Sequence, residues 1–408
     1  MAYQERNMTN PPRSARLHIA ILGRCNTGKS TVLNLIAGQH ISIVSAQPGT
    51  TADPVPVPFE LPILGPVNFY DTAGMDEASP LGLLRQAASR KVLARADLAV
   101  IVTDCQGIRE CEREIMQQLR LLETPFLLVF NKRDLGLPPP KDLVLCRKEG
   151  IEHIVLSAHA DREPAPLREA LIKLAPGVEK ETPLITDVLP AGATAVCVIP
   201  IDASAPKGRL ILPQVQVLRE LVENGHAAIA VQPSELPRTL GLLRKAPDIV
   251  ICDSQVVREL AAGLPSAMPL TTFSIIFARQ KGDFSLMANG AQAIAALPAG
   301  AHVLIAEACS HHPQHDDIAR VKIPALLQRC LGHELRFSFC SGVDFPEDIA
   351  RYSLVLHCGG CMLNRREMRR RLRMATAAGV PVSNYGMAIS FAQGILERAL
   401  RPFDVRLA

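Results

Sequence analysis

The sequence has few aromatic residues, no tryptophan and no long apolar run. Phenylalanine and tyrosine make up 4% of the 408 residues, so packed cores must be built mainly from the aliphatic part of the 48% hydrophobic content. A membrane-spanning helix needs about 18 or more consecutive apolar residues, and no such run is present. The segment Met1–Arg16 also lacks the apolar centre of a secretion signal. We therefore expect a cytoplasmic protein with no membrane partner.

A strong charge imbalance is also missing. The chain has 44 Lys and Arg against 40 Asp and Glu, a net charge of +4. This balance is too mild to predict binding to nucleic acid or to an anionic membrane surface. The eleven cysteines should be reduced, metal-bound or buried in the cytosol, rather than paired in disulfides.

A phosphate-binding loop lies near the N-terminus. The predicted strand Leu17–Leu22 runs into a GxxxxGKS motif at Gly23–Ser30, and a periodic helix follows over Val32–Ala37. Backbone N–H groups of such a loop surround phosphates, its lysine reaches the β- and γ-phosphates, and its serine hydroxyl binds Mg²⁺. The predicted nucleotide-binding residues of this segment are Gly23, Asn26, Thr27, Gly28, Lys29, Ser30 and Thr31.

Three further motifs follow along the chain, namely the polar loop Pro48–Asp53, a DTAG motif and an NKxD motif. A strand over Val67–Tyr70 ends in a DTAG motif, where Asp71 would hold Mg²⁺ and the Gly74 N–H would contact the γ-phosphate. The strand Phe126–Phe130 ends in an NKxD motif, whose Asp134 carboxylate accepts from two donors of guanine that adenine does not present. The remaining predicted nucleotide contacts are Thr50, Thr51, Asn131, Lys132, Ser157 and Ala158.

These motifs resemble the GTPases of tRNA modification and ribosome assembly. The resemblance implies that Thr51 binds Mg²⁺, that Asn26 coordinates K⁺ beside the phosphates, and that hydrolysis is stimulated by K⁺. Met75 stands where Ras-like GTPases have a glutamine that orients water, and a thioether cannot do this, so intrinsic hydrolysis should be slow. The predicted catalytic residues are Asn26, Lys29, Thr51 and Gly74.

Three cysteines follow two predicted strands in the last third of the chain. Val303–Ala306 precedes Cys309 and His311, and Leu354–Leu356 precedes Cys358 and Cys361. Parallel sheets place ligands at the carboxyl ends of their strands, and thiolates with imidazole bind zinc or an iron–sulfur cluster. A CxxC pair alone is also found in redox sites, and buried cysteines are often simple packing residues.

The organisation of the chain is predicted to be α/β throughout. Residues 1–176 would form the P-loop GTPase domain, 183–262 a small parallel α/β domain, and 263–408 a second small parallel α/β domain that carries the cysteines. The strands of the middle domain are very apolar for its size. We therefore predict that it forms a subunit interface, with an ordinary spacer domain as the alternative.

The cysteine motifs and their surroundings resemble the iron–iron hydrogenase maturation GTPases, the HydF family. The matching segments are Glu307–His312, Asp317–Pro324, Ser341–Pro346, His357–Met362, Asn384–Gly386 and Gly49–Val55. The resemblance implies a scaffold that is a homodimer or a higher oligomer, with a dimerisation domain and a 4Fe-4S cluster. It would receive a diiron subcluster from radical-SAM maturation enzymes and deliver this cargo to apo iron–iron hydrogenase.

On this resemblance the cluster ligands are Cys309, Cys358 and Cys361. His311 is predicted as a fourth ligand or, equally, as a hydrogen-bond donor next to the ligands. An RNA- or ribosome-associated GTPase with a structural Cys₃His zinc site is the alternative, and a redox-sensing GTPase with a dithiol is a weaker one. The basic segment Arg365–Arg373 is predicted to be a solvated helix face, with a docking surface for acidic partners as the other interpretation.

Overall fold

A computed structural model describes most of the chain. The described residues are 16–38, 56–61, 64–71, 92–93, 95–161, 163–175, 183–201, 210–308, 317–342, 345–360 and 363–404. They divide into two compact units, residues 1–179 and 180–408, and each unit is described by itself.

The first unit is built on a six-stranded sheet. Its strand order is β2-β3-β1-β4-β5-β6, and every pair is parallel except β2–β3. Strands buried on both faces are near-continuous apolar runs, as in the central strand Leu98–Thr103, where every residue is buried. The strands are β1 Leu17–Leu22, β2 Val57–Leu61, β3 Gly65–Asp71, β4 Leu98–Thr103, β5 Phe126–Phe130 and β6 His153–Val155.

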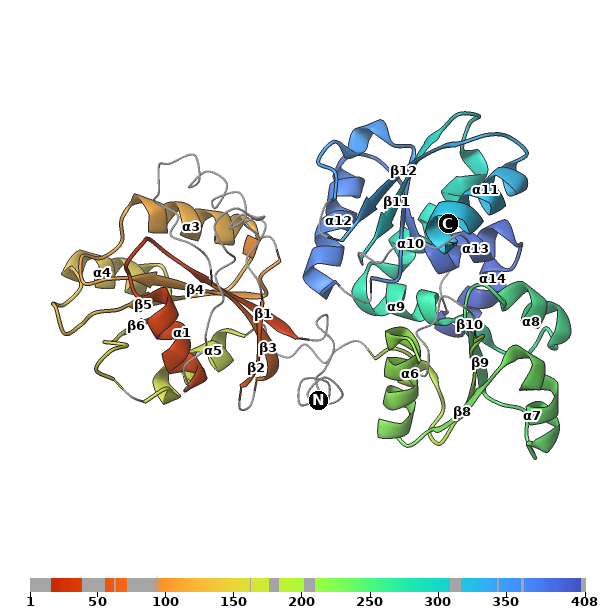
Figure 1. Cartoon of the computed structure of the whole chain (residues 1–408), viewed down its shortest axis with the longest axis horizontal. Coiled ribbons are helices and arrows are strands. Elements are labelled where there is room, and N and C mark those ends of the chain that lie inside the picture. Colours follow the sequence, from red (N-terminus) through yellow and green to blue (C-terminus); the bar gives the residue numbers. More distant parts are fainter. Residues whose placement is uncertain are drawn as a thin grey trace, which may run out of the picture. The chain divides into compact units, whose positions relative to one another are not determined.

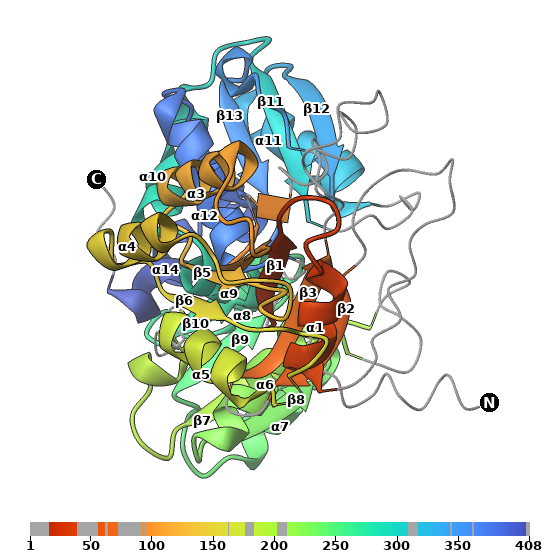
Figure 2. The same ribbon diagram turned by 90° about the vertical axis from the view of Figure 1, so that its left-hand side faces the viewer.

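Helices cover both faces of this sheet. Helices α1 (Lys29–Ala37) and α5 (Ala165–Leu174) pack on one face, while α3 (Glu110–Leu121) and α4 (Pro140–Lys148) pack on the other (Figure 1 and Figure 2). The two apolar cores are separated by the sheet, so alternate residues of β1 and β4 contribute to opposite cores. This three-layer arrangement presents the carboxyl ends of the parallel strands at one edge.

The second unit begins with a four-stranded parallel sheet of order β10-β9-β7-β8. Helix α6 covers one face together with α9, and helices α7 and α8 cover the other. The strands and helices are β7 Thr194–Val198, β8 Ala227–Val231, β9 Ile249–Cys252, β10 Leu270–Thr272, α6 Leu212–Glu223, α7 Leu236–Leu242, α8 Val257–Gly263 and α9 Phe273–Lys281.

A second four-stranded parallel sheet follows, with the order β12-β11-β13-β14. Helices α10 and α12 pack on one face, and α11 and α13 pack mainly on the other (Figure 1). The elements are β11 His302–Glu307, β12 Arg336–Ser341, β13 Leu354–His357, β14 Val382–Asn384, α10 Phe284–Gln292, α11 Ile323–Leu331, α12 Arg365–Ala377, α13 Tyr385–Ala392 and α14 Leu396–Leu400.

Helix α9 belongs to the cores of both sheets in this unit. Phe273, Ile276 and Phe277 pack with the strands β7 and β9. Ile275 and Ala278 pack with β11, β13 and α10 instead. One helix therefore joins the two small sheets, and its last turn lies beside the loop that follows β13.

The α/β fold class with a P-loop domain followed by further parallel-sheet units is confirmed. The division of residues 183–262 from 263–408 stays a prediction, because packing groups both within the unit 180–408. None of the helices in the described residues combines the length and apolar content that crossing a membrane requires.

Candidate functional site

The phosphate-binding loop connects β1 to α1 as the motif predicted. Gly28 immediately precedes the helix with a φ of 90°, and Asn26 has a φ of 61°. A Cβ atom on Gly28 would lie 2.3 Å from Nδ2 of Asn131, so glycine is required by both conformation and space. Gly23 is equally restricted, since its Cβ would lie 2.2 Å from the Val102 carbonyl oxygen. Ser30 and Thr31 are exposed in the first turn of α1.

Lys29 and Ser30 connect this loop to the end of β3. The Lys29 ammonium donates to the carbonyl oxygens of Gly23 at 3.1 Å and Arg24 at 2.8 Å, and so closes over the loop. The Ser30 hydroxyl donates to Asp71 Oδ2 at 2.8 Å. Burial raises the pKa of Asp71, against the lowering effects of Ser30 and Lys29. A divalent cation between this hydroxyl and carboxylate would favour the ionised form of Asp71, so the pair fits a Mg²⁺ site.

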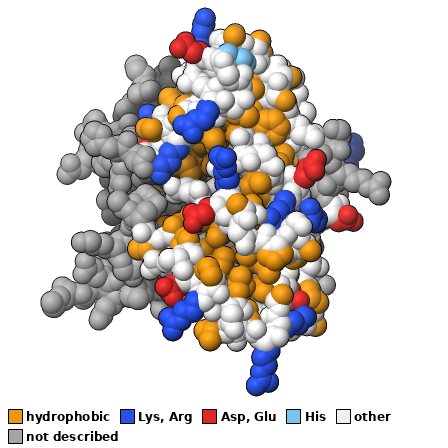
Figure 3. Space-filling view, turned by 90° about the vertical axis from the view of Figure 1, so that its right-hand side faces the viewer, with side chains coloured by type: hydrophobic (Ala, Val, Ile, Leu, Met, Phe, Trp, Pro, Cys, Tyr) orange, Lys and Arg blue, Asp and Glu red, His pale blue; other side chains and the backbone are white. Residues whose placement is uncertain are grey.

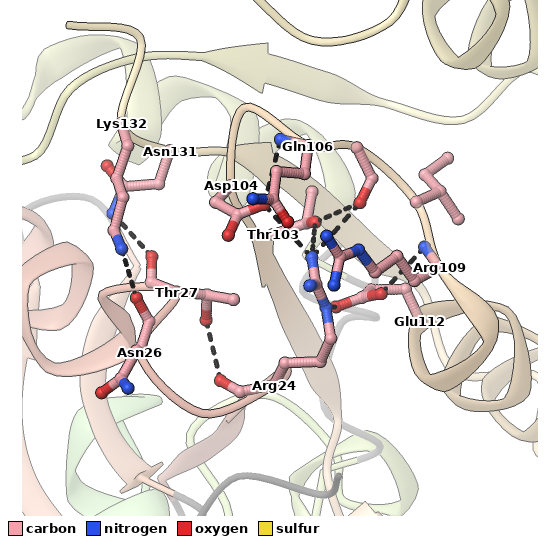
Figure 4. A network of polar contacts seen from close by, with 12 residues as sticks. Arg24, Asn26, Thr27, Thr103, Asp104, Gln106, Arg109, Glu112, Asn131 and Lys132 are labelled. Carbon is pink, nitrogen blue, oxygen red and sulfur yellow. Dashed lines mark hydrogen bonds and ion pairs between the residues drawn. The ribbon is translucent and has the colours of Figure 1, made fainter. Parts of the chain in front are cut away.

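The NKxD segment after β5 contacts the P-loop through hydrogen bonds to its backbone. The Asn131 amide donates to the Thr27 carbonyl at 2.9 Å, and its oxygen accepts from the Ala158 N–H at 2.9 Å. Lys132 donates to the carbonyl oxygen of Asn26 (Figure 4). Asn131 is 4% exposed, so it acts as a buried bridge between three loops. These contacts bring together five of the residues that the sequence predicted for nucleotide binding, with Gly28 against Asn131 as a sixth.

Asp134 lies at the exposed end of the same segment. The Ser157 hydroxyl donates a hydrogen bond to Asp134 Oδ1, and this bond lowers the pKa of the carboxyl group. Asp134 therefore stays ionised, and its other oxygen can accept from a base. Because the predicted base-contacting residues Asp134 and Ser157 are in contact, they form one patch beside the P-loop.

Sequence reasoning missed a buried ion-pair network behind the P-loop. Arg24 Nε donates to Glu112 Oε1 at 2.7 Å, and Arg24 Nη2 donates to the Thr103 hydroxyl at 3.0 Å and to Asp104 at 3.2 Å (Figure 4). Arg24 is 7% exposed and Glu112 is fully buried. The other oxygen of Glu112 accepts from the Arg109 N–H at the start of α3. The one sequence signal was a glutamate as the third residue of a helix, which is typical of an N-terminal cap.

Some predicted nucleotide contacts cannot be compared with the structure. The predicted switch residues Thr50, Thr51 and Gly74 lie outside the described residues, as does Met75. Their roles in Mg²⁺ binding and catalysis stay predictions.

The two strands that precede the predicted cysteine ligands are neighbours. Strands β11 and β13 pair in parallel, with Ala306 opposite His357. The N–H of Ala308, one residue before Cys309 in the sequence, donates to Cys358 Sγ at 3.0 Å. An N–H directed at sulfur stabilises a thiolate, which is the form that binds metals. The described part of this site therefore fits a thiolate-bound metal centre.

The loop after β13 is held by buried polar contacts at three of its described residues, Cys358, Gly360 and Leu363. The Cys358 N–H donates to the Ala306 carbonyl at 2.9 Å, and Lys281 donates to the carbonyl oxygens of Gly360 and Leu363, both at 2.8 Å. Gly360 has a φ of 65°, in the left-handed region that favours glycine. The loop backbone thus has fixed partners on β11 and at the end of α9.

The prediction that Arg365–Arg373 is a solvated helix face is wrong for its central residues. Arg371 is 1% exposed and donates to Glu367 Oε1 at 2.9 Å, His357 Nε2 at 2.9 Å and the Gly342 carbonyl at 2.7 Å. Arg370 is half-buried and also pairs with Glu367. The helix turns Met368, Leu372 and Ala375 into the core, and Arg371 lies on the same side. Arg369 and Arg373 are exposed.

His357 is a supporting residue in this arrangement. It is 1% exposed, and burial, followed by the charge of Arg371, lowers its pKa to about 3. An arginine can only donate, so Nε2 must accept and the ring proton must be on Nδ1. Nδ1 then donates to the Cys358 carbonyl at 2.9 Å. His357 is therefore neutral, and both ring nitrogens are occupied.

The remaining predicted ligands Cys309, His311 and Cys361 lie outside the described residues. Among the side chains that the structure describes, no group of three His, Cys, Asp or Glu residues is arranged to hold a metal ion. The ligand set therefore stays a prediction that rests on Cys358 and on the adjacent strand ends.

Comparison with protein families assigns three consecutive segments of the chain. Residues 18–132 match the family described as 50S ribosome-binding GTPase. Residues 184–282 match the Hydrogen maturase F dimerization domain, and residues 285–402 match the Hydrogen maturase F tetramerization domain. The segment with the predicted cysteine ligands thus lies within the match to the last of these families.

Curated relatives resemble the GTPase part. GTPase Era of Marinobacter nauticus is 34% identical over 182 residues, covering 42% of this chain and 58% of that protein. The tRNA modification GTPase MnmE of Nitrosomonas europaea is 35% identical over 166 residues, covering 39% of this chain and 35% of that protein. The chain thus spans about one third to just over one half of the length of these relatives.

Solved structures similar to the chain include Aquifex aeolicus Era, with 20% identity and a TM-score of 0.33 over 56% of this chain and 98% of that one. The FeoB G-domain from Methanococcus jannaschii has 23% identity and a TM-score of 0.30 over 39% of this chain and 97% of that one.

A GTPase domain followed by both maturase-specific domains covers most of the sequence. The chain therefore belongs to the hydrogen maturase F family, the HydF-type hydrogenase maturation GTPases.

Proposed function

We propose that this protein is a GTP-hydrolysing scaffold of iron–iron hydrogenase maturation that binds a 4Fe-4S cluster. It would receive the diiron subcluster precursor as cargo and deliver it. The observation that carries the proposal is the pairing of β11 with β13, next to which the N–H of Ala308 donates to Cys358 Sγ at 3.0 Å. Ala308 directly precedes Cys309 in the sequence. Cysteines far apart in the sequence thereby follow neighbouring strand ends in a family that serves hydrogenase maturation.

The nucleotide machinery is proposed to follow the motif residues. Lys29 neutralises the β- and γ-phosphates, while Ser30, Asp71 and Thr51 hold Mg²⁺ directly or through water. Asp134 and the loop at Ser157 and Ala158 select guanine. Support comes from the Ser30–Asp71 and Ser157–Asp134 hydrogen bonds, which bring the members of each pair together.

Potassium is proposed to accelerate hydrolysis through Asn26 and the phosphates. Asn26 has a left-handed backbone conformation in the P-loop, and its carbonyl accepts from Lys132. A cation beside the phosphates supplies transition-state charge stabilisation where no water-orienting glutamine is available. Hydrolysis in buffers that differ only in K⁺ or Na⁺ tests this, and equal rates would contradict it.

The cluster site is proposed to use Cys309, Cys358 and Cys361, with His311 as the fourth ligand or a neighbouring donor. A cluster held by three thiolates keeps one iron with an exchangeable position, which suits attachment of cargo. The protein's own contribution is to hold the thiols at the ends of β11 and β13. Radical-SAM maturation enzymes and apo iron–iron hydrogenase in the cytoplasm are the proposed partners.

Self-association is proposed to use the sheet of the middle segment. Strand β8 is the edge of that sheet, and its residues Ala227 and Ala230 are exposed, as is Val222 on α6 with 65% of its surface accessible. Seen from the right of Figure 1, the second unit carries a broad area of hydrophobic side chains (Figure 3). An edge strand with small apolar residues can pair with a second copy.

Light scattering of Ala230→Lys tests this interface. A charge on the β8 edge should lower the molar mass, while Leu121→Lys on the first unit should leave it unchanged. A mass unaffected by Ala230→Lys would exclude the β8 edge.

Metal analysis after anaerobic purification tests the proposed function as a whole. Iron with acid-labile sulfide in the wild type, and loss of both in Cys358→Ser, would support the scaffold. Stoichiometric zinc without sulfide would instead support the alternative of an RNA- or ribosome-associated GTPase with a structural Cys₃His site.

A further inference from the structure

Two buried cations, from different helices, reach the end of β13 and the described residues of the loop that follows it. Lys281 is the last residue of α9 and is 6% exposed, and Arg371 lies in the middle of α12 and is 1% exposed. Burial of a cation is expensive unless its hydrogen-bonding groups are satisfied. Two buried cationic side chains, Lys281 and Arg371, thus lie beside one short loop.

Lys281 holds the part of the loop that follows the first cysteine. Its ammonium donates to the Gly360 and Leu363 carbonyl oxygens at 2.8 Å each, and it lies 5.7 Å from the centre of the Phe277 ring. The Leu363 N–H also donates to the Gly360 carbonyl at 3.0 Å, so Gly360 and Leu363 contact each other as well as the ammonium. Cys361 lies between these two residues in the sequence.

Arg371 supports the start of the loop, at His357 and Cys358. Arg371 donates to His357 Nε2, which places the ring proton on Nδ1, and Nδ1 donates to the Cys358 carbonyl. Glu367 accepts from Arg371 Nε and compensates its charge. A chain of two hydrogen bonds, through His357, therefore connects α12 to the backbone of Cys358.

We propose that Lys281 and Arg371 are positioning residues that fix the backbone at Cys358, Gly360 and Leu363, and so hold Cys358 in place for metal binding. The inference rests on the proposed function, because it takes this loop to be a metal site. It goes further by assigning a role to two residues outside the cysteine motif. It also assigns His357 to the support of the loop and not to the metal.

Cobalt binding to the metal-free full-length protein tests the inference. Co²⁺ is titrated anaerobically, and thiolate-to-cobalt charge-transfer absorption reports binding at the cysteines, whichever metal is native. Residues that support metal ligands typically contribute 10- to 100-fold to affinity. We expect Co²⁺ affinity to fall by about that factor in Lys281→Met and Arg371→Met. The ligand-field bands, which report the geometry at cobalt, should also change.

Arg369→Met is the matched control. Arg369 lies on the same helix and carries the same charge, but it is exposed and faces a groove with Arg373 and Asp283. Its Co²⁺ affinity and spectrum should equal those of the wild type. Lys281→Met keeps the apolar stem over Phe277, so it tests the inference even if Arg371→Met does not fold.

The outcomes separate the inference from the function it rests on. Wild-type protein that gives no thiolate-to-cobalt band overturns the proposed metal site and the inference with it. Wild-type binding that both variants reproduce overturns the inference alone. In a third outcome, Co²⁺ binding in the variants falls only in proportion to the loss of folded protein, with unchanged ligand-field bands. That result shows that Lys281 and Arg371 only stabilise the fold, and it also overturns the inference.

Discussion

Arg24 and Glu112 form a buried ion pair, 2.7 Å apart, that joins the P-loop to the first turn of α3. Neither side chain was predicted to matter for nucleotide binding. Burial alone would lower the pKa of Arg24, yet the hydrogen bond and charge of Glu112, with help from Asp104, raise it. The pair therefore anchors the P-loop at Arg24 to the first turn of α3.

Arg24→Met should destabilise the protein strongly. It leaves Glu112 as a buried and uncompensated charge, which typically costs about 3–5 kcal/mol. Urea unfolding, monitored with a probe placed in the first unit, measures this loss in the free energy of unfolding. Arg120→Met is the control, because Arg120 forms a surface pair with Glu149, which is worth about 0–1 kcal/mol. Equal effects of the two substitutions would contradict the assigned role of Arg24.

Asp134→Asn should weaken GTP binding and change base preference. The amide loses the charge-assisted hydrogen bonds to guanine, worth about 1.5–3 kcal/mol, or on the order of 10- to 100-fold in affinity. It also supplies a donor that matches the 2-oxo group of xanthine. Fluorescent-nucleotide titrations with GTP and XTP measure both effects. Unchanged GTP affinity would remove Asp134 from the base site.

Glu367→Gln should destabilise the second unit at neutral pH by roughly 3–5 kcal/mol, because Arg371 would be buried without its counter-charge. Burial tends to raise the pKa of Glu367, but Arg370 and Arg371 lower it overall. A carboxylate with a lowered folded pKa stabilises above its unfolded pKa, and this contribution is lost as pH falls through the folded value.

The difference between wild type and Glu367→Gln should therefore be largest near pH 7 and shrink below about pH 4.5. Urea unfolding at several pH values measures it. Glu397→Gln, at an exposed position on α14, should show little difference at any pH. A difference between wild type and Glu367→Gln that stays constant down to low pH would contradict the ion-pair assignment.

Gly290→Ala should destabilise the last sheet by about 1–3 kcal/mol or more, through overpacking. A Cβ at this position in α10 would lie 2.0 Å from the Val382 carbonyl oxygen on β14. Gly241→Ala in α7 meets no atom within 4 Å and should stabilise by about 0.4–1 kcal/mol. Thermal unfolding of both variants compares them directly, and a neutral Gly290→Ala would show that α10 can move away from β14.

The nucleotide site was predictable because its motifs carry their own geometry. Gly28 and Asn131 are far apart in sequence, yet each motif follows a buried apolar strand, and the parallel pairing of β1 and β5 with β4 brings those ends together. The same reasoning placed Cys358 after β13. Thr50, Thr51, Gly74, Cys309, His311 and Cys361 were predicted from their motifs together with the family resemblance, and they remain predictions.

The support of the cysteine loop could not be predicted in this way. The run around Arg371 is dominated by arginine, which favours a solvated helix, but tertiary contacts with His357 and the Gly342 carbonyl decide its burial. The spacing of Met368, Leu372 and Ala375 did contain a signal for a buried face. The three-residue strands β10 and β14 escaped prediction because buried polar residues such as Thr271 and Asn384 interrupt their apolar pattern. Strand β12 escaped it because it is a partly exposed edge strand in which polar residues alternate with apolar ones.

The central claim is that the thiols following β11 and β13 hold one iron–sulfur centre in a GTPase scaffold. Anaerobic EPR of the reduced, reconstituted protein compares wild type with Cys358→Ala most directly. We predict a 4Fe-4S signal in the wild type that is lost or strongly altered in the variant, while GTP binding is unchanged. Identical signals in both proteins, or no iron–sulfur signal in either, would contradict the account.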